Sequence, residues 1–316
     1  MRLSLGFVSI CLSEKSCSPA GSVTYRSIQT LDPESQRLRI ARTARRNLEN
    51  TLRILWFMDA HAIELYRISA TMIPLATHPV TDGWAWWEES ELVEVGRRIG
   101  TVARERGYRL SSHLPEVCGF TSSESYKWMC AYLEYHRRLF DLMGLGPDTR
   151  IVVHVGGAYG NKGAALRVAR TNIDALDPWA RERLALENDD RTYTLEDVTT
   201  LAGDTGLAVV CDWHHHVVNS GGRSDPDEIR PLIEAAGRLR GNRPLKVHVS
   251  SPKNSNQVRA HADYVDIDFV RPFFDLLTTL DASQIDVMVE AKQKDLALLQ
   301  LRDQLRQSAA AQREGM

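Results

Sequence analysis

Histidines, aspartates and glutamates stand at or near the carboxyl-terminal ends of several short apolar segments. The clearest case is residues 207–216, where an apolar run ends in Asp212 and three consecutive histidines, with His215 three positions after the aspartate. A buried strand favours apolar, β-branched residues, so these polar groups have no packing reason to be there. Carboxylate oxygen and imidazole nitrogen are good ligands for divalent cations. The segment therefore predicts part of a metal site.

The same arrangement recurs along the chain, and this recurrence favours a metal centre over a polar turn. The candidate metal ligands are His113, His154, Glu187, Asp212, His215, Lys246, His248, His261 and Glu290. A single histidine in such a place is usually a structural hydrogen-bonding group, but the convergence of many ligand types from six segments is not explained that way. They are too many for one ion, so we expect two or three clustered ions. Such clusters suit in-line phosphoryl displacement, with Glu187, Asp212, Lys246 and Glu290 as the expected catalytic residues.

Lys246 is the unusual member of this set. It precedes His248 by two positions, so both side chains should lie on one face of a strand. An ammonium group beside divalent cations is repelled by them. Lys246 must therefore be neutral, turned toward a phosphate, or carboxylated to give an anionic bridging ligand, and the sequence leaves these alternatives open.

Bringing these side chains together requires a fold in which many strand ends meet at one place. The expected strands are residues 3–10, 63–68, 109–113, 151–155, 184–187, 207–212, 245–249 and 285–290. The expected helices between and after them are residues 33–57, 84–106, 123–143, 164–176, 195–204, 226–240, 269–280 and 293–305. This alternation predicts a single (β/α)8 TIM barrel over residues 1–307, with the metal site at the carboxyl-terminal ends of the strands. We expect residues 308–316 to be a disordered tail.

Composition sets wider bounds. The 316 residues are 43% hydrophobic and 25% charged, as in an ordinary globular enzyme, and no apolar run is long enough to span a membrane. Five cysteines without a Cys-x-x-Cys pair favour a reduced, cytoplasmic compartment. The formal net charge of −2 favours no class of partner, because bound cations would reverse the local sign at the site. We expect a monomer with no membrane partner.

Long, colinear motifs over nearly the whole chain resemble the UV damage endonuclease family. They include LYRISATMIPLATHP (65–79), HVGGAYGNK (154–162), LENDDRTYT (186–194), CDWHHH (211–216), KVHVSSPK (246–253) and VEAKQKD (289–295). The resemblance implies a TIM barrel related to endonuclease IV, with a multi-metal site that prefers Mn2+. It also implies nicking of UV-damaged double-stranded DNA immediately 5′ to a photoproduct. The family's metal ligands then correspond to the candidates above, and Lys246 matches a lysine that is carboxylated in the family.

The resemblance further implies DNA contacts. Tyr66, Arg67, Ser69, Ser250 and Lys253 would lie where DNA phosphates pass.

One motif departs from the family. The segment after the third-strand histidine usually carries a glutamine and an aromatic residue that probe the lesion, whereas this chain has Glu116 and Val117. We expect these two residues to face DNA, but with weaker reading of the lesion.

Two alternatives stay open. A damage-recognition protein without turnover would bind DNA and not cut it, although the full set of ligands speaks against this reading. A sugar isomerase or epimerase on the same barrel would also use His, Asp and Glu with manganese, but it would need fewer ions and would have no affinity for DNA.

Overall fold

Eight short parallel strands form a closed barrel in this computed structural model, which describes residues 1–314. Each strand pairs with the next in sequence, and β8 pairs with β1. The strands are β1 (Arg2–Val8), β2 (Leu65–Arg67), β3 (Arg109–His113), β4 (Arg150–His154), β5 (Leu184–Glu187), β6 (Ala208–Asp212), β7 (Leu245–Val249) and β8 (Gln284–Val289). The predicted (β/α)8 barrel is confirmed.

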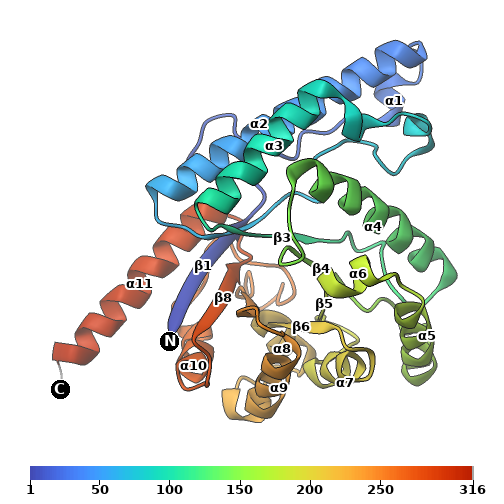
Figure 1. Cartoon of the computed structure of the whole chain (residues 1–316). Coiled ribbons are helices and arrows are strands. Elements are labelled where there is room, and N and C mark those ends of the chain that lie inside the picture. The colour runs from blue at the N-terminus through green and yellow to red at the C-terminus, as the bar shows by residue number, and fades with distance from the viewer. Residues whose placement is uncertain (315–316) are drawn as a thin grey trace.

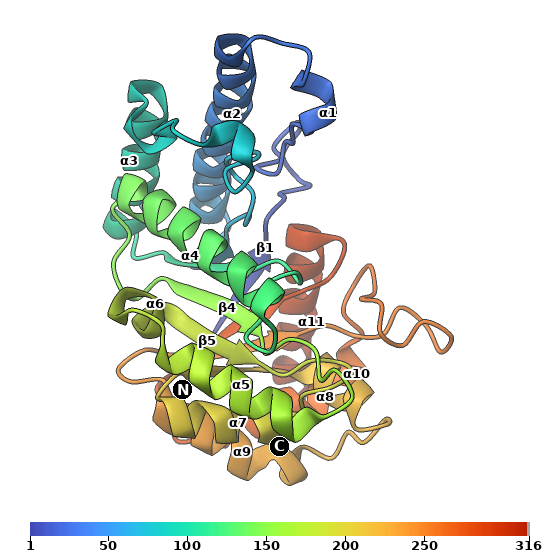
Figure 2. The ribbon, with the colours of Figure 1, turned by 90° about the vertical axis from the view of Figure 1, so that its right-hand side faces the viewer.

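Helices surround the barrel (Figure 1). They are α1 (Tyr25–Ile28), α2 (Pro33–Ala60), α3 (Ser90–Glu105), α4 (Ser123–Met143), α5 (Lys162–Asp174), α6 (Pro178–Arg183), α7 (Leu195–Thr205), α8 (Trp213–Asn219), α9 (Pro226–Leu239), α10 (Ile267–Thr278) and α11 (Lys294–Glu314), with 3-10 turns at Pro79–Thr81 and Trp86–Glu88. Figure 2 shows α2 and α3 standing upright side by side, and the orange loop between β7 and α10 projecting on the right. No helix within residues 1–314 combines the length and the apolar character needed to cross a membrane.

Local sequence explains where the main helices begin and end. Asp32 caps α2, its side chain accepting from the Ser35 amide at 3.0 Å, and a proline follows at the first helical position. Thr194 and Asp197 form a reciprocal capping box at the start of α7. Gly144 ends α4 in the left-handed conformation at φ 63°, which glycine adopts without the steric cost of a side chain. The predicted stop at Gly144 is therefore confirmed.

Several predicted boundaries are wrong. The helix expected from Trp84 begins only at Ser90, because residues 86–88 form a 3-10 turn that buries Trp86. Strand β2 is limited to three residues, where six were expected. The final helix continues to Glu314 and does not end near residue 305, so most of the expected tail is helical. Residues 315–316, the end of that tail, lie outside the described residues.

The sequence-based prediction missed α1, α6 and α8, and α8 affects the site directly. His215 was expected in a loop, but it lies on α8, whose first turn is capped by Asp212. Trp213 fixes this helix against α10, because its ring stacks on Phe273 at 4.9 Å and its Nε1 donates to the Phe269 carbonyl at 3.0 Å. A short capped helix leaves little periodic signal in the sequence, which explains the error.

The barrel interior is filled in part by small apolar side chains. Two clusters separate from the main core are Val152, Ala185, Ala208 and Val210, and Val8, Leu65 and Met288. Because side chains alternate along a strand, the residue two positions further along each strand also faces the interior. This places His154, Glu187 and Asp212 one layer above Val152, Ala185 and Val210 at the carboxyl-terminal mouth.

His136 on α4 should make the stability of the protein fall in mild acid. Its Nδ1–H donates to the Tyr132 carbonyl and its Nε2 accepts from the Ser112 hydroxyl, both at 2.7 Å. Complete burial lowers its pKa from 6.5 to about 4. At mildly acidic pH, His136 therefore binds a proton in the unfolded chain but not in the folded chain. As a result, the free energy of unfolding decreases as the pH falls from about 6.5 toward 4.

We expect this residue to cost about 2 kcal/mol of unfolding free energy between pH 7.5 and pH 5. Urea unfolding in EDTA at the two pH values, for the wild type and His136→Gln, measures the difference. An equal pH dependence in both proteins would show that other groups cause the acid sensitivity.

Candidate metal centre

Strand register brings the polar residues together at the carboxyl-terminal mouth. His154 on β4 lies directly opposite Glu187 on β5, and Asp212 on β6 lies opposite His248 on β7. Glu290 follows the last residue of β8. Each position faces the interior because it continues the alternation of its strand. The site is therefore built from neighbouring strand ends, whose geometry is fixed by the main-chain ladder.

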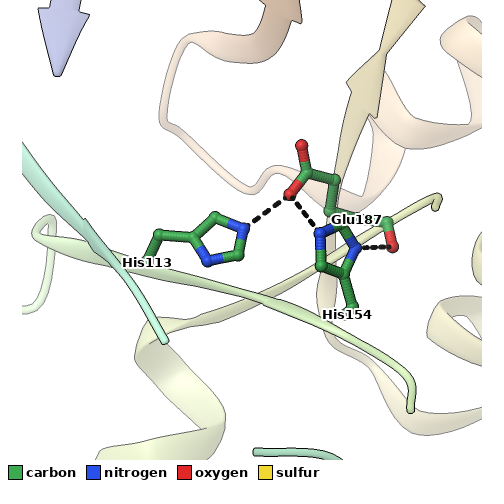
Figure 3. A group of neighbouring side chains, drawn as sticks. All are labelled: His113, His154 and Glu187. Carbon is green, nitrogen blue, oxygen red and sulfur yellow. Dashed lines mark hydrogen bonds and ion pairs between the residues drawn. The ribbon is translucent and has the colours of Figure 1, made fainter. Parts of the chain in front are cut away.

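Glu187 lies at the centre of this group and is only 1% exposed. Its Oε2 is 2.8 Å from His113 Nε2 and 3.6 Å from His154 Nε2 (Figure 3). Its Oε1 is 2.6 Å from His248 Nδ1 and 4.0 Å from His215 Nδ1. The carboxylate thus has one oxygen directed to each of two histidine pairs.

Two overlapping groups have the ligand atoms and separations that a metal ion requires. The first group is His113, His154 and Glu187, and the second is Glu187, Asp212, His248 and Glu290; within each, one ligand atom per residue lies within 4.8 Å of the others. Glu187 belongs to both groups. An ion held by each group would therefore share Glu187 as a ligand.

Main-chain carbonyl groups orient four histidines in the same way. The Nδ1 atoms of His113 and His154 are 2.7 Å and 3.3 Å from the carbonyl oxygens of Leu114 and Glu187. Those of His215 and His261 are 3.0 Å and 2.6 Å from the carbonyl oxygens of Asn188 and Glu290.

A carbonyl oxygen can only accept, so in each of these histidines Nδ1 carries a proton, and when Nε2 carries none the ring presents a lone pair there. This is the tautomer in which histidine binds a metal through Nε2.

Two buried atoms of the site have no hydrogen-bond partner among the described residues, namely Asp212 Oδ2 and His248 Nε2. Buried polar atoms normally have a hydrogen-bond partner, so two buried atoms without one need an explanation. A divalent cation bound by carboxylate and imidazole would satisfy Asp212 directly. The donor set, four oriented imidazoles with three buried carboxylates and His248, fits Mn2+, Zn2+ or Fe2+.

Electrostatics in the site also indicates a place for cations. Burial alone would lower the pKa of His248, but the charges of Glu187 and Glu290 raise it to about 9. The pKa of His215 is likewise raised to about 9, against the effect of burial, by Asp212, Glu187 and Glu290. Arg67 forms an ion pair with Glu290 and, with His248, holds the pKa of that carboxyl group well below its usual range despite burial. The Glu290 carboxylate therefore stays ionised and attracts positive charge.

Lys246 does not join these groups. It lies in the interior layer below His248, opposite Asp286 on β8, and lines a cavity at the amino-terminal end of the barrel. Burial lowers its pKa. The structure shows no hydrogen bond or ion pair for its ammonium group within residues 1–314. Its ligand role stays a prediction.

The residues expected to contact DNA fall into two sets. Tyr66, Ser69 and Ser250 are buried, and the Tyr66 hydroxyl donates to the Ser9 carbonyl. This placement does not fit a direct contact between Tyr66 and a DNA phosphate. The Tyr66 ring is fully buried, and this packing role explains why β2 carries an aromatic residue here. Arg67 is partly buried against Glu290. Glu116, Val117 and Lys253 are exposed on loops that follow β3 and β7, at the same end as the metal centre.

Sequence reasoning did not identify the residues that brace these loops. Asn188 is fully buried and exchanges two 2.9 Å hydrogen bonds with the Asp212 main chain, which joins β5 to β6. Arg259 forms a two-pronged ion pair with Asp190 at 2.6 Å and 2.9 Å, and so joins the loop after β7 to the loop after β5. The run of polar residues after β5 indicates a functional turn. No periodicity in the sequence, however, identifies the residues that Asn188 and Arg259 contact.

Fold and site together define a class: a (β/α)8 barrel with a candidate divalent-metal centre at its carboxyl-terminal mouth, where barrel enzymes have their active sites. Residues 3–314 match the family model of the UV-endonuclease UvdE. The chain belongs to the UV-endonuclease UvdE family and is an endonuclease.

Individual relatives agree with this assignment. The UV DNA damage endonuclease of Bacillus cereus (strain B4264) is 36% identical over 314 residues, covering 96% of this chain and 95% of that protein. That of Bacillus thuringiensis subsp. konkukian is also 36% identical over 314 residues. The crystal structure of SacUVDE superposes with a TM-score of 0.82 at 25% identity, covering 98% of this chain and 99% of the other. A D-tagatose 3-epimerase-like protein shares the fold, with a TM-score of 0.56 at 12% identity over 99% of each chain.

Proposed function

We propose that this endonuclease uses two or three divalent cations, with Mn2+ preferred, to nick UV-damaged double-stranded DNA immediately 5′ to a photoproduct. The observation that carries the proposal is the pair of ligand groups bridged by Glu187 at the mouth of a barrel that resembles UV DNA damage endonucleases over nearly its whole length. The five cysteines are unpaired, which agrees with action in the cytoplasm, and we expect a monomer.

Bound cations would supply a water molecule of lowered pKa and would neutralise charge on the phosphate. The residues of the chain prepare the site for this chemistry. Four histidines would hold ions through Nε2, and Glu187, Asp212 and Glu290 would supply buried negative charge. Arg67 keeps Glu290 ionised and fixes its orientation. Exposed Lys253 lies where a cationic side chain can hold a DNA phosphate close to the mouth.

Nicking of supercoiled plasmid tests the proposal. Purified protein with Mn2+ should nick UV-irradiated plasmid faster than unirradiated plasmid, and excess EDTA should stop the reaction. An end-labelled duplex with one photoproduct then gives the cut position, expected at the first phosphodiester on its 5′ side. Full activity in EDTA would contradict metal dependence. Binding of damaged DNA without nicking would indicate a recognition protein.

The loop after β3 should limit discrimination between damaged and intact DNA. Val117 is 45% exposed but small, and the Glu116 carboxylate, if it approaches DNA, is repelled by phosphates. Glu116 already contributes charge near Arg259 on the adjacent loop. Replacing Glu116 by Gln and Val117 by Tyr should increase the preference for UV-damaged duplex roughly fivefold or more, since aromatic stacking contributes about 1–3 kcal/mol per base.

Dissociation constants for damaged and intact duplex, measured at one salt concentration, give this preference directly. The control is Val168→Tyr, which adds the same ring to an exposed position on α5, away from the mouth. If the wild type already discriminates as well as the double variant, another loop reads the lesion, and residues 13–25 are the next to examine.

Carboxylation of Lys246 stays a prediction that can be tested without activity. Protein equilibrated with 13C-labelled bicarbonate should show a carbamate carbon resonance that is absent from Lys246→Met. The buried position and lowered pKa of this lysine favour the neutral amine that carboxylation requires. A spectrum without that resonance, at mildly basic pH and with diamagnetic Zn2+ in place of Mn2+, would leave Lys246 as an uncarboxylated lysine.

A further inference from the structure

A cavity of about 330 Å³ lies at the amino-terminal end of the barrel, opposite the candidate metal centre. Its rim is formed by the segments that precede β3, β4 and β7, and its floor includes Ala185 and Ala208. These two small side chains leave the barrel interior incompletely filled at this level. The volume lies at the lower end of the range of about 300–1,000 Å³ that is typical of small-molecule sites.

Positive charge dominates the lining of this cavity. The charged residues, apart from Lys246, are Arg104, Arg109, Arg150, Arg240, Arg243, Asp148 and Asp286. Arg109 pairs with Asp286 at 2.9 Å, and Arg243 pairs with Asp148 at 3.0 Å. Both aspartates are thus already engaged, and the other three arginines have no carboxylate within 4 Å among the residues that the structure describes.

Arg150 is the least expected of the three, because it is only 9% exposed. Its guanidinium group donates to the carbonyl oxygens of Glu182 at 2.9 Å and of Arg240 at 3.2 Å. These bonds satisfy donors but do not balance the charge. Burial and the nearby Arg243 lower its pKa to about 10, against the opposing effect of the Asp148 and Glu182 carboxylates. A buried cation with no anion in direct contact is costly, so the lining would stabilise negative charge placed inside the cavity.

We propose that this cavity binds a phosphate group, either as inorganic phosphate or on a small phosphorylated molecule. Arginine side chains present paired donors that match phosphate oxygens, and three unpaired cations suit a dianion better than a single carboxylate. The apolar wall that contains Ala185 and Ala208 leaves room for a small organic group. The charge balance does not depend on Lys246, since three unpaired arginines remain whichever form that lysine adopts.

Calorimetric titration of the full-length protein tests this site. Sodium phosphate and adenosine monophosphate are titrated separately into Mn2+-loaded and EDTA-treated protein, with sodium chloride at matched ionic strength as the reference. Arg240→Gln removes one cation from the cavity, and Ala208→Leu fills it without a change of charge. Arg97→Gln serves as the control, because it makes the same change at an exposed arginine on α3 that does not line the cavity.

In the EDTA-treated protein we expect saturable binding that weakens at least tenfold in Arg240→Gln and in Ala208→Leu and stays unchanged in Arg97→Gln. Tighter binding of adenosine monophosphate than of phosphate would identify a phosphorylated small molecule as the ligand, and the reverse would identify inorganic phosphate. Heats no larger than those of chloride, or equal affinity in the wild type and a folded Arg240→Gln variant, would overturn the proposal. The unfolding transition of each variant shows that it is folded.

Discussion

Glu187→Gln should nick UV-irradiated plasmid about a thousandfold more slowly than the wild type. Metal ions stabilise transition-state charge by several kcal/mol, and each 1.4 kcal/mol corresponds to a factor of ten in rate. Glu187 is the residue shared by both ligand groups, with one oxygen near His113 and His154 and the other near His248. Glutamine has nearly the same shape, but it replaces a charged oxygen with an N–H donor directed at these histidines.

The measurement is a single-turnover nicking rate at saturating enzyme, together with the bound Mn2+ per chain. Both should fall, because the substitution affects both cation positions. Glu182→Gln is the matched control: it makes the same chemical change on α6, at a side chain that is 53% exposed. A Glu187→Gln protein that keeps its full metal content and nicks within tenfold of the wild-type rate would show that Glu187 is not the bridging ligand.

Asp212→Asn should separate catalysis from folding. The two oxygens of Asp212 have different environments: Oδ1 accepts from the His215 amide at 2.8 Å and caps α8, whereas Oδ2 has no partner among the described residues. Asparagine can keep the cap and lose the free oxygen. We expect the nicking rate to fall by about a hundredfold or more, while the unfolding free energy in EDTA changes by less than about 1 kcal/mol.

Asp212→Ala provides the comparison, because it removes the cap as well. It should be about 1 kcal/mol less stable than Asp212→Asn, as is typical when an N-cap residue is replaced by alanine. Urea unfolding and nicking rates for both variants give the two effects independently. Equal stability of the two variants would mean that the cap is unimportant, and an active Asp212→Asn protein would exclude Oδ2 as a ligand.

The barrel and most of the candidate centre could be predicted from the sequence because both depend on strand ends. Alternation of apolar strands with helices defines the fold, and a histidine or carboxylate at a strand end must face the mouth. His113, His154, Glu187 and Asp212 follow from this rule. Lys246 belongs to the predicted ligand set as well, but the layer of the barrel in which it lies depends on the stagger between β7 and its neighbours, so its ligand role stays a prediction. Alternation along one strand does not give that stagger.

Other features depend on contacts between distant segments. The burial of Tyr66 results from packing against Phe7, with ring centres 5.3 Å apart, and from a hydrogen bond to Ser9. The Arg259–Asp190 pair joins two loops that are 69 residues apart in sequence. A resemblance in sequence suggests that such residues have a role, but it does not identify the residues that they contact. Only the folded structure shows those contacts.

The carbonyl groups that orient His113, His154, His215 and His261 bear on how this site tolerates mutation. Every residue supplies a carbonyl group, so the acceptor does not depend on which side chain stands at position 114 or 188, and the buried side chains of Leu114 and Asn188 act on the ring only through the main-chain path that they help to fix. The orientation of the imidazoles is therefore encoded in the path of the main chain. A substitution near the site therefore moves an imidazole only if it moves the main chain, whereas an insertion or deletion within a strand would rotate a ligand out of the mouth and could not be compensated by any single substitution nearby.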